Sequence, residues 1–395
     1  MPEEAPQSNP KRIPYARQSI DDSDREAVAA ALRSDFITQG PRNGYFEDAL
    51  KEATGARYAV AVSSGTAALH LAYLGLGMGD GDVGISPAIT FAATANALRY
   101  CGSEVDFCDV DPQSGLARVA DFRERVDALA IAGQKAKLFA PVSFTGRMPR
   151  LREISEYAAQ CGAYVVEDAA HSIGAHCDST KSASCTHSDA AVLSFHPVKH
   201  VCAGEGGAVL TNDETLARRA RNLRSHGIER PLEAMDKEGA WFYAQTELGW
   251  NYRMTEMQAA LGNSQLERLD GFVARRRAIA QRYDEAFRSP IFRNGFERPE
   301  MTRGSSWHLY VIRFPSSNLR REAYDFFQAN GIGVQVHYIP VYRHPYYRKV
   351  GYDALPGSEA FYEGCLSLPL FPALSDDEQQ RVVDTAERFC RSIDI

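Results

Sequence analysis

Short apolar runs alternate with amphipathic stretches from residue 58 to about residue 225. Strands that are apolar on both faces and separated by helices are typical of a mainly parallel sheet covered by helices. The strands are expected at residues 58–64, 83–87, 104–110, 137–144, 163–168, 189–195 and 206–212. The helices are expected at residues 66–77, 91–102, 151–162 and 213–227.

The pattern changes in the last third of the chain. Residues 254–287 carry apolar side chains at helical spacing for about nine turns, which predicts one long connecting helix. Strands are then expected at residues 308–314 and 333–339, with a helix over residues 321–331 between them. This mixture predicts a smaller α+β unit.

The chain ends on a further predicted helix, over residues 375–393. Ser375 is a favourable N-cap, and the acidic first turn suits the positive end of the helix dipole. We therefore predict an α/β protein of two domains. The large domain, with an N-terminal arm, takes residues 1–268, and the small α+β domain takes residues 269–395.

Composition narrows the class of protein by exclusion. A chain of 395 residues with 44% hydrophobic and 24% charged residues is neither a disordered tail nor a fibre nor a small disulfide scaffold. The formal net charge of −7 argues against a nucleic-acid-binding protein. No apolar stretch approaches the ~20 residues that span a bilayer.

The compartment is expected to be the cytoplasm. The N-terminal sequence MPEEAPQSNPKR is polar and has no apolar core of the kind a secretory signal needs. The eight cysteines are scattered without a C-x-x-C pair, which indicates buried free thiols under reducing conditions. No membrane or nucleic-acid partner and no metal site are expected.

Four features of the large domain carry candidate chemistry, and the first is the turn Ser63-Ser64-Gly65-Thr66. It closes a predicted strand and opens a predicted helix. The unpaired backbone N–H groups and hydroxyls of such a turn suit a phosphate. An ordinary N-cap with a permissive glycine is the alternative.

The second feature is Asp168, in the sequence EDAAH that follows a predicted strand. The carboxyl ends of parallel strands form the rim where α/β sheets bind ligands. A carboxylate there can hold a protonated ring nitrogen through a charge-assisted hydrogen bond. A helix-capping aspartate is the alternative.

The third and fourth features are a lysine and an aromatic ring. Lys199 follows the predicted strand 189–195 and precedes the glycine-rich residues 204–207. Partial desolvation there would lower the pKa of its amine and make it nucleophilic, whereas a surface loop lysine is the alternative. Phe91 follows a strand and turn, where it can stack on a ring or belong to the core.

Together these features match the needs of pyridoxal 5′-phosphate (PLP). The cofactor needs a phosphate seat, a stacking ring, a lysine for the Schiff base and an acid that keeps the pyridine nitrogen protonated. The sequence therefore predicts a PLP enzyme in which Lys199 and Asp168 are the catalytic residues.

Motifs in an ordered series identify a family. They are GTAAL at 65–69, EDAAH at 167–171, Ser194 to Gly207 with Lys199, and LGWNYR at 248–253. In this order they resemble the DegT/DnrJ/StrS-type sugar-nucleotide aminotransferases, which are PLP enzymes of the aspartate aminotransferase fold (fold type I). The resemblance runs from about Ile13 to the C-terminus.

Other segments resemble the branch of this family that acts in pseudaminic acid biosynthesis. That branch uses L-glutamate to aminate C4 of a UDP-linked 4-keto-6-deoxy-N-acetyl-L-hexosamine, with pyridoxamine phosphate as the intermediate cofactor form. The segments are PYARQSI (14–20), SDFITQGP (34–41), SHGI (225–228), VHYIP (336–340) and the pair Tyr346 and Tyr347.

The resemblance also implies roles for individual residues. Lys199 would form the Schiff base, and Asp168 would bind the pyridinium nitrogen. Asn251 would reach the phosphate of the neighbouring subunit's cofactor, which implies a homodimer with shared active sites. The other cofactor contacts would be Gly65, Thr66 and Ser194 at the phosphate, Phe91 over the ring, and His171 near O3′.

The substrate contacts are the part of the predicted site that the sequence specifies least. Arg253 is a candidate for an acidic group of glutamate or of the sugar nucleotide, and a structural salt bridge is its alternative. Two segments depart from the family pattern, because residues 178–185 lack the usual glycine-bearing turn and residues 111–117 lack a Thr-x-Asn sequence. Both are expected in surface connections. Sugar-nucleotide contacts are further expected from Thr38, Gln39, His337 and Tyr338.

Three rival functions compete with this interpretation. A PLP sugar dehydratase of the same family carries a histidine at the lysine position, and Lys199 speaks against it. An aminotransferase for another nucleotide-linked 4-keto sugar, such as a UDP-4-keto-pentose or a 4-keto-D-hexosamine, stays open because pocket shape decides stereochemistry. A non-catalytic regulator or scaffold with a PLP fold would not need Lys199 and Asp168 together with the phosphate seat.

Overall fold

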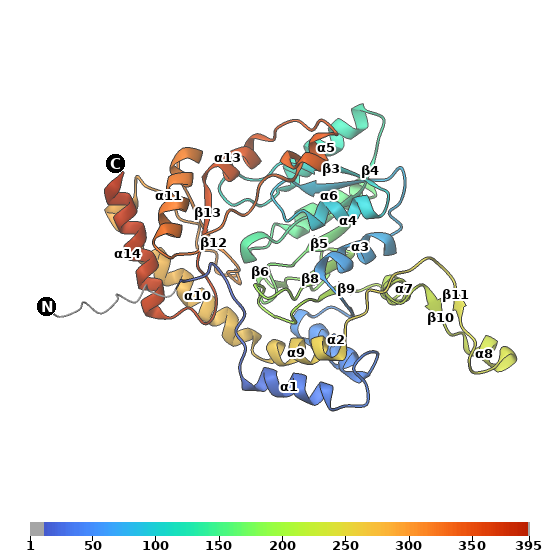
Figure 1. Ribbon diagram of the computed structural model, residues 1–395. Helices are drawn as coiled ribbons and strands as arrows, with labels where there is room; N and C mark the ends of the chain where they lie inside the picture. Colours follow the sequence, from blue (N-terminus) through green and yellow to red (C-terminus); the bar gives the residue numbers. More distant parts are fainter. Residues whose placement is uncertain (1–11, 394–395) are drawn as a thin grey trace.

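A seven-stranded sheet forms the centre of the computed structural model, which describes residues 12–393 (Figure 1). The strands lie in the order β1-β9-β8-β5-β4-β2-β3, and only β9 runs antiparallel to its neighbours. The predicted, mainly parallel sheet is thereby confirmed. Its strands are β1 (Tyr58–Val62), β2 (Val83–Pro87), β3 (Glu104–Cys108), β4 (Ala136–Phe139), β5 (Tyr164–Asp168), β8 (Ala190–Ser194) and β9 (Gly207–Thr211).

Helices cover both faces of this sheet, and its strands are therefore buried on both sides. On one face lie α3, α4 and α7, and on the other lie α2, α9, α5 and α6. These helices are α2 (Pro41–Thr54), α3 (Gly65–Gly75), α4 (Ala93–Tyr100), α5 (Val119–Ile131), α6 (Leu151–Cys161), α7 (Glu214–Arg224) and α9 (Glu256–Glu267).

The long connecting helix predicted over residues 254–287 is wrong, because two helices meet there at Arg268. They are α9 (Glu256–Glu267) and α10 (Leu269–Ala286). The Arg268 guanidinium forms ion pairs with Asp21 and Asp24, which lie at the start of α1 (Asp22–Leu32). Both helices keep an apolar face across the break, so periodicity alone could not reveal it.

The C-terminal part contains a two-stranded sheet, in which β12 (Tyr310–Arg313) pairs antiparallel with β13 (Cys365–Leu368). The strand predicted at residues 333–339 is wrong. β13 takes the place beside β12, and that segment makes only a single bridge, from Gln335 to Ser367 of β13. The helices of this part are α11 (Ser317–Ala329), α12 (Pro345–Arg348), α13 (Pro356–Gly364) and α14 (Asp376–Ser392).

The last helix, α14, begins as the sequence predicts. The hydroxyl of Ser375 accepts a hydrogen bond from the Glu378 backbone N–H at 3.1 Å, and the Glu378 carboxylate accepts one from the Ser375 N–H at 3.0 Å. Ile13, near the start of the described chain, is buried among apolar side chains of this C-terminal part. The division into domains at residue 268 stays a prediction, which the break at Arg268 supports.

Residues 178–185 form the predicted surface connection only in their first half, because residues 178–181 are exposed or half-buried whereas residues 182–185 are buried. Residues 178–181 are the turn and second strand of the hairpin of β6 (His176–Cys177) and β7 (Thr180–Lys181), after which Ser182 and Ala183 are buried. The reason is the buried carboxylate of Glu167, which accepts hydrogen bonds from the Ser182 hydroxyl at 2.9 Å and the Ala183 N–H at 3.0 Å. Residues 111–117 are partly buried as well.

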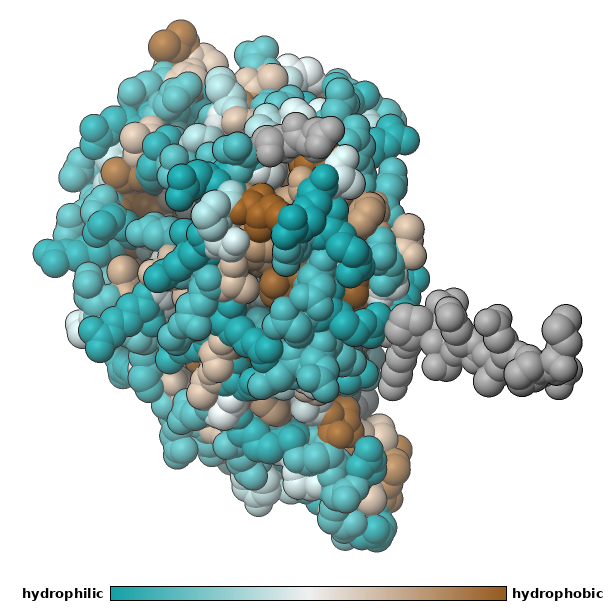
Figure 2. All heavy atoms as spheres, turned by 90° about the vertical axis from the view of Figure 1, so that its left-hand side faces the viewer, coloured by the Kyte–Doolittle hydropathy of each residue, from teal (hydrophilic) through white to brown (hydrophobic). Residues whose placement is uncertain are grey.

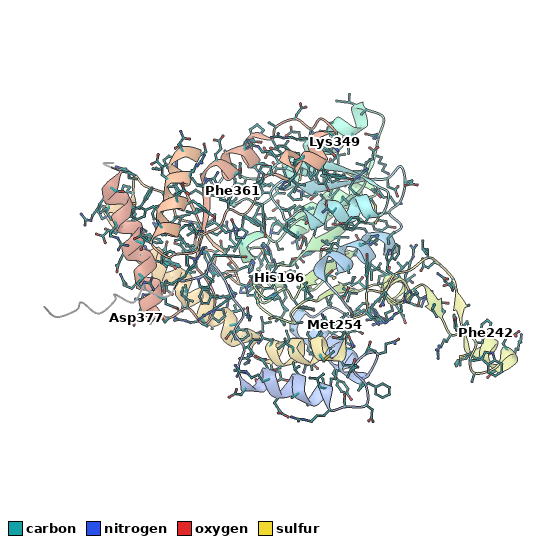
Figure 3. All side chains as sticks on the ribbon, viewed as in Figure 1. His196, Phe242, Met254, Lys349, Phe361 and Asp377 are labelled. Atoms are coloured by element: carbon teal, nitrogen blue, oxygen red, sulfur yellow. The ribbon has the colours of Figure 1, made fainter. Side chains whose placement is uncertain are left out.

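One segment projects from the body of the molecule beyond α7 (Figure 1). It contains β10 (Ile228–Glu229), α8 (Leu232–Glu238) and β11 (Ala244–Gln245). Phe242 lies near its far end, well away from the central His196 (Figure 3). Its exposed apolar side chains include Leu232 and Trp241, which are 78% and 79% exposed.

The opposite side of the molecule is mostly hydrophilic. Figure 2 shows this face, which lies on the side of α11 and α14, with hydrophobic residues only in scattered spots. None of the helices within residues 12–393 combines the length and the apolar character needed to cross a bilayer.

Candidate active site

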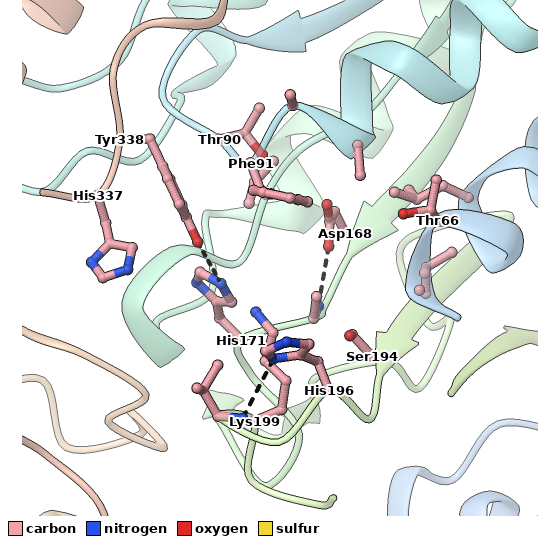
Figure 4. A pocket seen from close by; sticks show the side chains of 18 of the residues that line it. Thr66, Thr90, Phe91, Asp168, His171, Ser194, His196, Lys199, His337 and Tyr338 are labelled. Atoms are coloured by element: carbon pink, nitrogen blue, oxygen red, sulfur yellow. Dashed lines mark hydrogen bonds between the residues drawn. The ribbon is translucent and has the colours of Figure 1, made fainter. Parts of the chain in front are cut away.

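A pocket of about 740 Å³ opens at the carboxyl ends of β5 and β8 (Figure 4). It collects residues from the turn after β1, the segment after β2, the loop after β8 and the C-terminal segment 335–344. Nine of the residues expected from the sequence line it, namely Gly65, Thr66, Phe91, Asp168, His171, Ser194, Lys199, His337 and Tyr338.

Lys199 reaches this pocket from the loop that follows β8. The loop turns tightly, because the Lys199 N–H donates to the His196 carbonyl at 2.8 Å. Burial lowers the pKa of the Lys199 amine to about 8, and the Asp168 carboxylate opposes that shift. Lys199 therefore lines a cavity and presents an amine that loses its proton far more readily than a surface lysine would.

Asp168 is the last residue of β5 and is 6% exposed. Its carboxylate accepts hydrogen bonds from the Thr94 hydroxyl at 2.7 Å and from the Ala170 N–H at 3.1 Å. Burial raises the pKa of Asp168, while these bonds and the charge of Lys199 oppose the shift. A buried carboxylate of this kind gains from a cationic partner, so it suits a protonated ring nitrogen.

The start of α3 forms the third wall of the pocket. Ser64 is the N-cap, since its hydroxyl accepts a hydrogen bond from the Ala67 N–H at 3.1 Å. The N–H groups of Gly65 and Thr66 remain without intrahelical acceptors, as in the first turn of any helix. A Cβ at Gly65 would lie only 2.9 Å from the Ser194 Cβ, so glycine keeps this cradle open. Its donors fit a phosphate.

Phe91 and His171 complete the pocket beside Tyr338. Phe91 is 60% exposed and is therefore not a core residue. The Nε2 atom of His171 lies 3.3 Å from the Tyr338 hydroxyl, and burial lowers the pKa of His171 well below its usual value. Burial likewise lowers the pKa of His337 to about 3. Both imidazoles are thus neutral at physiological pH.

Four expected site residues lie outside this pocket. Thr38 and Gln39 are exposed, and Thr38 forms an antiparallel bridge with Thr255. Asn251 is exposed as well, and Arg253 forms no ion pair within the described residues, so the salt-bridge alternative finds no support. We call Thr38, Gln39, Asn251 and Arg253 the outer group.

Several residues in or beside the pocket were missed. Thr94, which binds Asp168, is the most informative of them, because it stands four residues after Thr90 on the first turn of α4. A threonine pair at that spacing beside a sheet rim is the signal that could have indicated it. Other lining residues missed by the sequence analysis are Tyr15, Thr90, His196, Gln335 and His344.

The fold is that of the PLP-dependent aminotransferases of fold type I, as predicted. PseC of Helicobacter pylori, an aminotransferase involved in the biosynthesis of pseudoaminic acid, matches with a TM-score of 0.89 and 27% identity over 97% of this chain and 100% of that one. NtdA of Bacillus subtilis, solved with bound cofactor PMP, matches with a TM-score of 0.82 and 27% identity over 94% of this chain and 83% of that one.

The family assignment rests on the sequence as well. Residues 18–387 match the DegT/DnrJ/EryC1/StrS aminotransferase family, and the chain belongs to it. Among its curated relatives is the UDP-4-amino-4,6-dideoxy-N-acetyl-beta-L-altrosamine transaminase of Campylobacter jejuni, which is 34% identical over 382 residues, 94% of this chain and 96% of the relative.

Proposed function

We propose that the protein is a PLP-dependent sugar-nucleotide aminotransferase that moves the amino group of L-glutamate to C4 of a UDP-linked 4-keto-6-deoxy-N-acetyl-L-hexosamine. The products are the 4-amino sugar nucleotide and 2-oxoglutarate, as in pseudaminic acid biosynthesis. The observation that carries the proposal is that Lys199 and Asp168 share one pocket with the free N-terminus of α3. The relatives from Campylobacter and Helicobacter support the choice of sugar.

The residues of the pocket fit PLP, and the PMP bound to NtdA supports the same cofactor. Lys199 would hold the cofactor covalently, and Asp168 would meet its ring nitrogen. Bound PLP supplies an electron sink for the carbanion formed at Cα of the amino donor. The open cradle at Gly65 would take the phosphate together with Thr66 and Ser194, while Phe91 would lie over the ring.

The chain itself supplies the proton transfers. An amine with a pKa of about 8 could take the proton from Cα of glutamate and deliver it to C4′ of the cofactor. Asp168, fixed by Thr94, would stabilise positive charge on the ring nitrogen. His171 and the Tyr338 hydroxyl would orient the cofactor's O3′ side from the opposite wall.

We further propose a homodimer with shared active sites. Asn251 is exposed and lies outside its own pocket, which supports a role in the site of a second copy. The exposed apolar side chains of the projecting segment support burial against a partner. Arg253, two residues from Asn251, would then bind an acidic group of glutamate or of the sugar nucleotide.

The test is a product assay with defined keto sugars. The purified protein, PLP and L-glutamate are incubated with the UDP-linked 4-keto-6-deoxy-N-acetyl-L-hexosamine, and a UDP-4-keto-pentose serves as the comparison. We expect mass spectrometry to detect the amino hexosamine and an equal amount of 2-oxoglutarate. Amination of the pentose alone would contradict the sugar assignment, and amination of neither would contradict the function.

A further inference from the structure

Two smaller hollows continue from the active-site pocket along α4. The first, of about 440 Å³, shares Ala92 and His344 with that pocket. The second, of about 520 Å³, shares Arg99, Tyr346 and Tyr347 with the first and reaches the start of the edge strand β3. The two hollows thus form one side groove that begins at the active site.

The direction of the groove matches the shape of the proposed substrate. Helix α4 starts at the pocket, where Thr94 binds Asp168, and Arg99 lies five residues further on, roughly 8 Å along the helix axis. In a pyranose ring, C1 and C4 are at opposite ends. If C4 lies at Lys199, the diphosphate on C1 must point away from Lys199 toward the outside of the pocket.

Arg99 provides the charge that a diphosphate requires. It is exposed, its Nη1 atom donates to the Ser103 carbonyl at 2.8 Å, and it forms no ion pair within residues 12–393. The Tyr346 hydroxyl beside it raises the pKa of Arg99. By contrast, Arg125 in the second hollow already binds both carboxylate oxygens of Asp106 at 3.0 Å.

Aromatic rings flank this arginine. Tyr100 and Tyr346 are 56% and 58% exposed, which leaves ring surface open to solvent. Tyr347 is buried, and its hydroxyl donates to the Asn96 side chain at 2.6 Å. Exposed aromatic faces of this kind bind nucleobases by stacking, and the stacking tolerates any base.

We propose that the side groove binds the nucleotide part of the sugar nucleotide, with Arg99 at the diphosphate and Tyr346 against the base. This inference rests on the proposed function, because it names the site for one part of that substrate. It adds a binding site to the chain at residues that no cofactor contact involves.

The proposal is tested by titrating the holoenzyme with UDP in a calorimeter. Arg99→Gln should weaken UDP binding by roughly 10- to 100-fold, as expected for loss of a charge-assisted hydrogen bond to an anion. Tyr346→Ser should weaken the binding of UDP and of uridine alike, by about 10-fold. The matched control is Arg123→Gln, which removes another exposed arginine that lies 5.0 Å over a tyrosine ring, outside the groove.

The possible outcomes distinguish a failure of the side-groove proposal from a failure of the proposed function. Unchanged UDP affinity in both groove variants, with thermal denaturation showing folded protein, would overturn the proposal. So would a wild-type enzyme that converts glutamate to 2-oxoglutarate but does not bind UDP. An enzyme that binds UDP through Arg99 but never converts glutamate would support the groove and overturn the proposed function.

Discussion

Asp168 and Lys199, which we call the pocket floor, and the outer group differ in how far the local sequence determines where their side chains lie. Asp168 is the last residue of β5 and Lys199 lies in the loop after β8, and the parallel arrangement of β5 and β8 brings their side chains to one rim. The outer group lies outside that rim, where Thr38, Gln39 and Asn251 are exposed and Arg253 is half-buried. Strand-and-turn order is therefore enough to bring Asp168 and Lys199 together, whereas in the proposed homodimer the outer group would act only with a second subunit.

The largest effect is expected on the pocket floor, from Lys199→Ala. Loss of the amine removes both the covalent attachment of the cofactor and the general base, so transamination should fall by at least ~10³-fold. The measurement is 2-oxoglutarate release from L-glutamate. Lys181→Ala, which changes an exposed lysine bonded to the Ala53 carbonyl, is the control. Activity of Lys199→Ala within tenfold of that control would contradict the assignment.

The next largest effect is expected from Asp168→Asn. An amide cannot balance the charge on the ring nitrogen, so the rate of the glutamate half-reaction should fall by roughly 10²- to 10³-fold. Thr94→Val leaves the carboxylate in place and removes one of its hydrogen bonds, so its loss should be smaller, about tenfold. Stopped-flow absorbance gives both rates. Equal rates for Asp168→Asn and wild type would rule out the pyridinium role.

A smaller effect is expected in the outer group, from Asn251→Ala. Loss of one hydrogen bond to the cofactor phosphate should weaken PLP binding to the apoprotein by about tenfold. At limiting PLP, mixing Asn251→Ala subunits with inactive Lys199→Ala subunits should restore activity. The hybrid dimer then has one site with an intact Lys199 and an intact Asn251 from its partner. Failure of mixing to restore activity, with dimers present, would contradict shared sites.

The smallest effect is a shift along the pH axis. Lys199 in the apoprotein should react with an amine-acylating reagent with a midpoint near pH 8, because burial lowers its pKa to about 8. The Asp168 carboxylate raises that pKa, so Asp168→Asn should move the midpoint to lower pH. Labelling of the Lys199 peptide is followed by mass spectrometry against pH. A midpoint near that of free lysine, or a shift to higher pH, would contradict the effects of burial and of Asp168 on the pKa of Lys199.

The predictions made from the sequence divide in the same way, into those that local pattern decides and those that distant contacts decide. The seven strands of the sheet and five pocket residues follow from local order, because buried strands and their carboxyl ends leave a direct pattern in the chain. These five are Gly65, Thr66, Phe91, Asp168 and Lys199, whereas the other four pocket residues were expected only from the family resemblance. The break at Arg268 depends on Asp21 and Asp24, more than 240 residues away in sequence. Apolar periodicity contains no sign of such a contact.

The two other errors have the same cause. The segment 333–339 alternates like a strand, but β13 already occupies the position beside β12. The segment after β7 reads as a polar surface turn, yet the buried carboxylate of Glu167 draws Ser182 and Ala183 inward. In each case a distant partner decided the conformation, which is information that local patterning lacks.

The central claim, that Lys199 and Asp168 form a working PLP site, is tested most directly by the absorption spectrum of the purified protein with PLP. The account predicts a visible band from the lysine-bound cofactor that moves into the near ultraviolet on addition of L-glutamate and returns on addition of 2-oxoglutarate. A protein that develops no visible band with PLP, or whose band does not respond to glutamate, would contradict it.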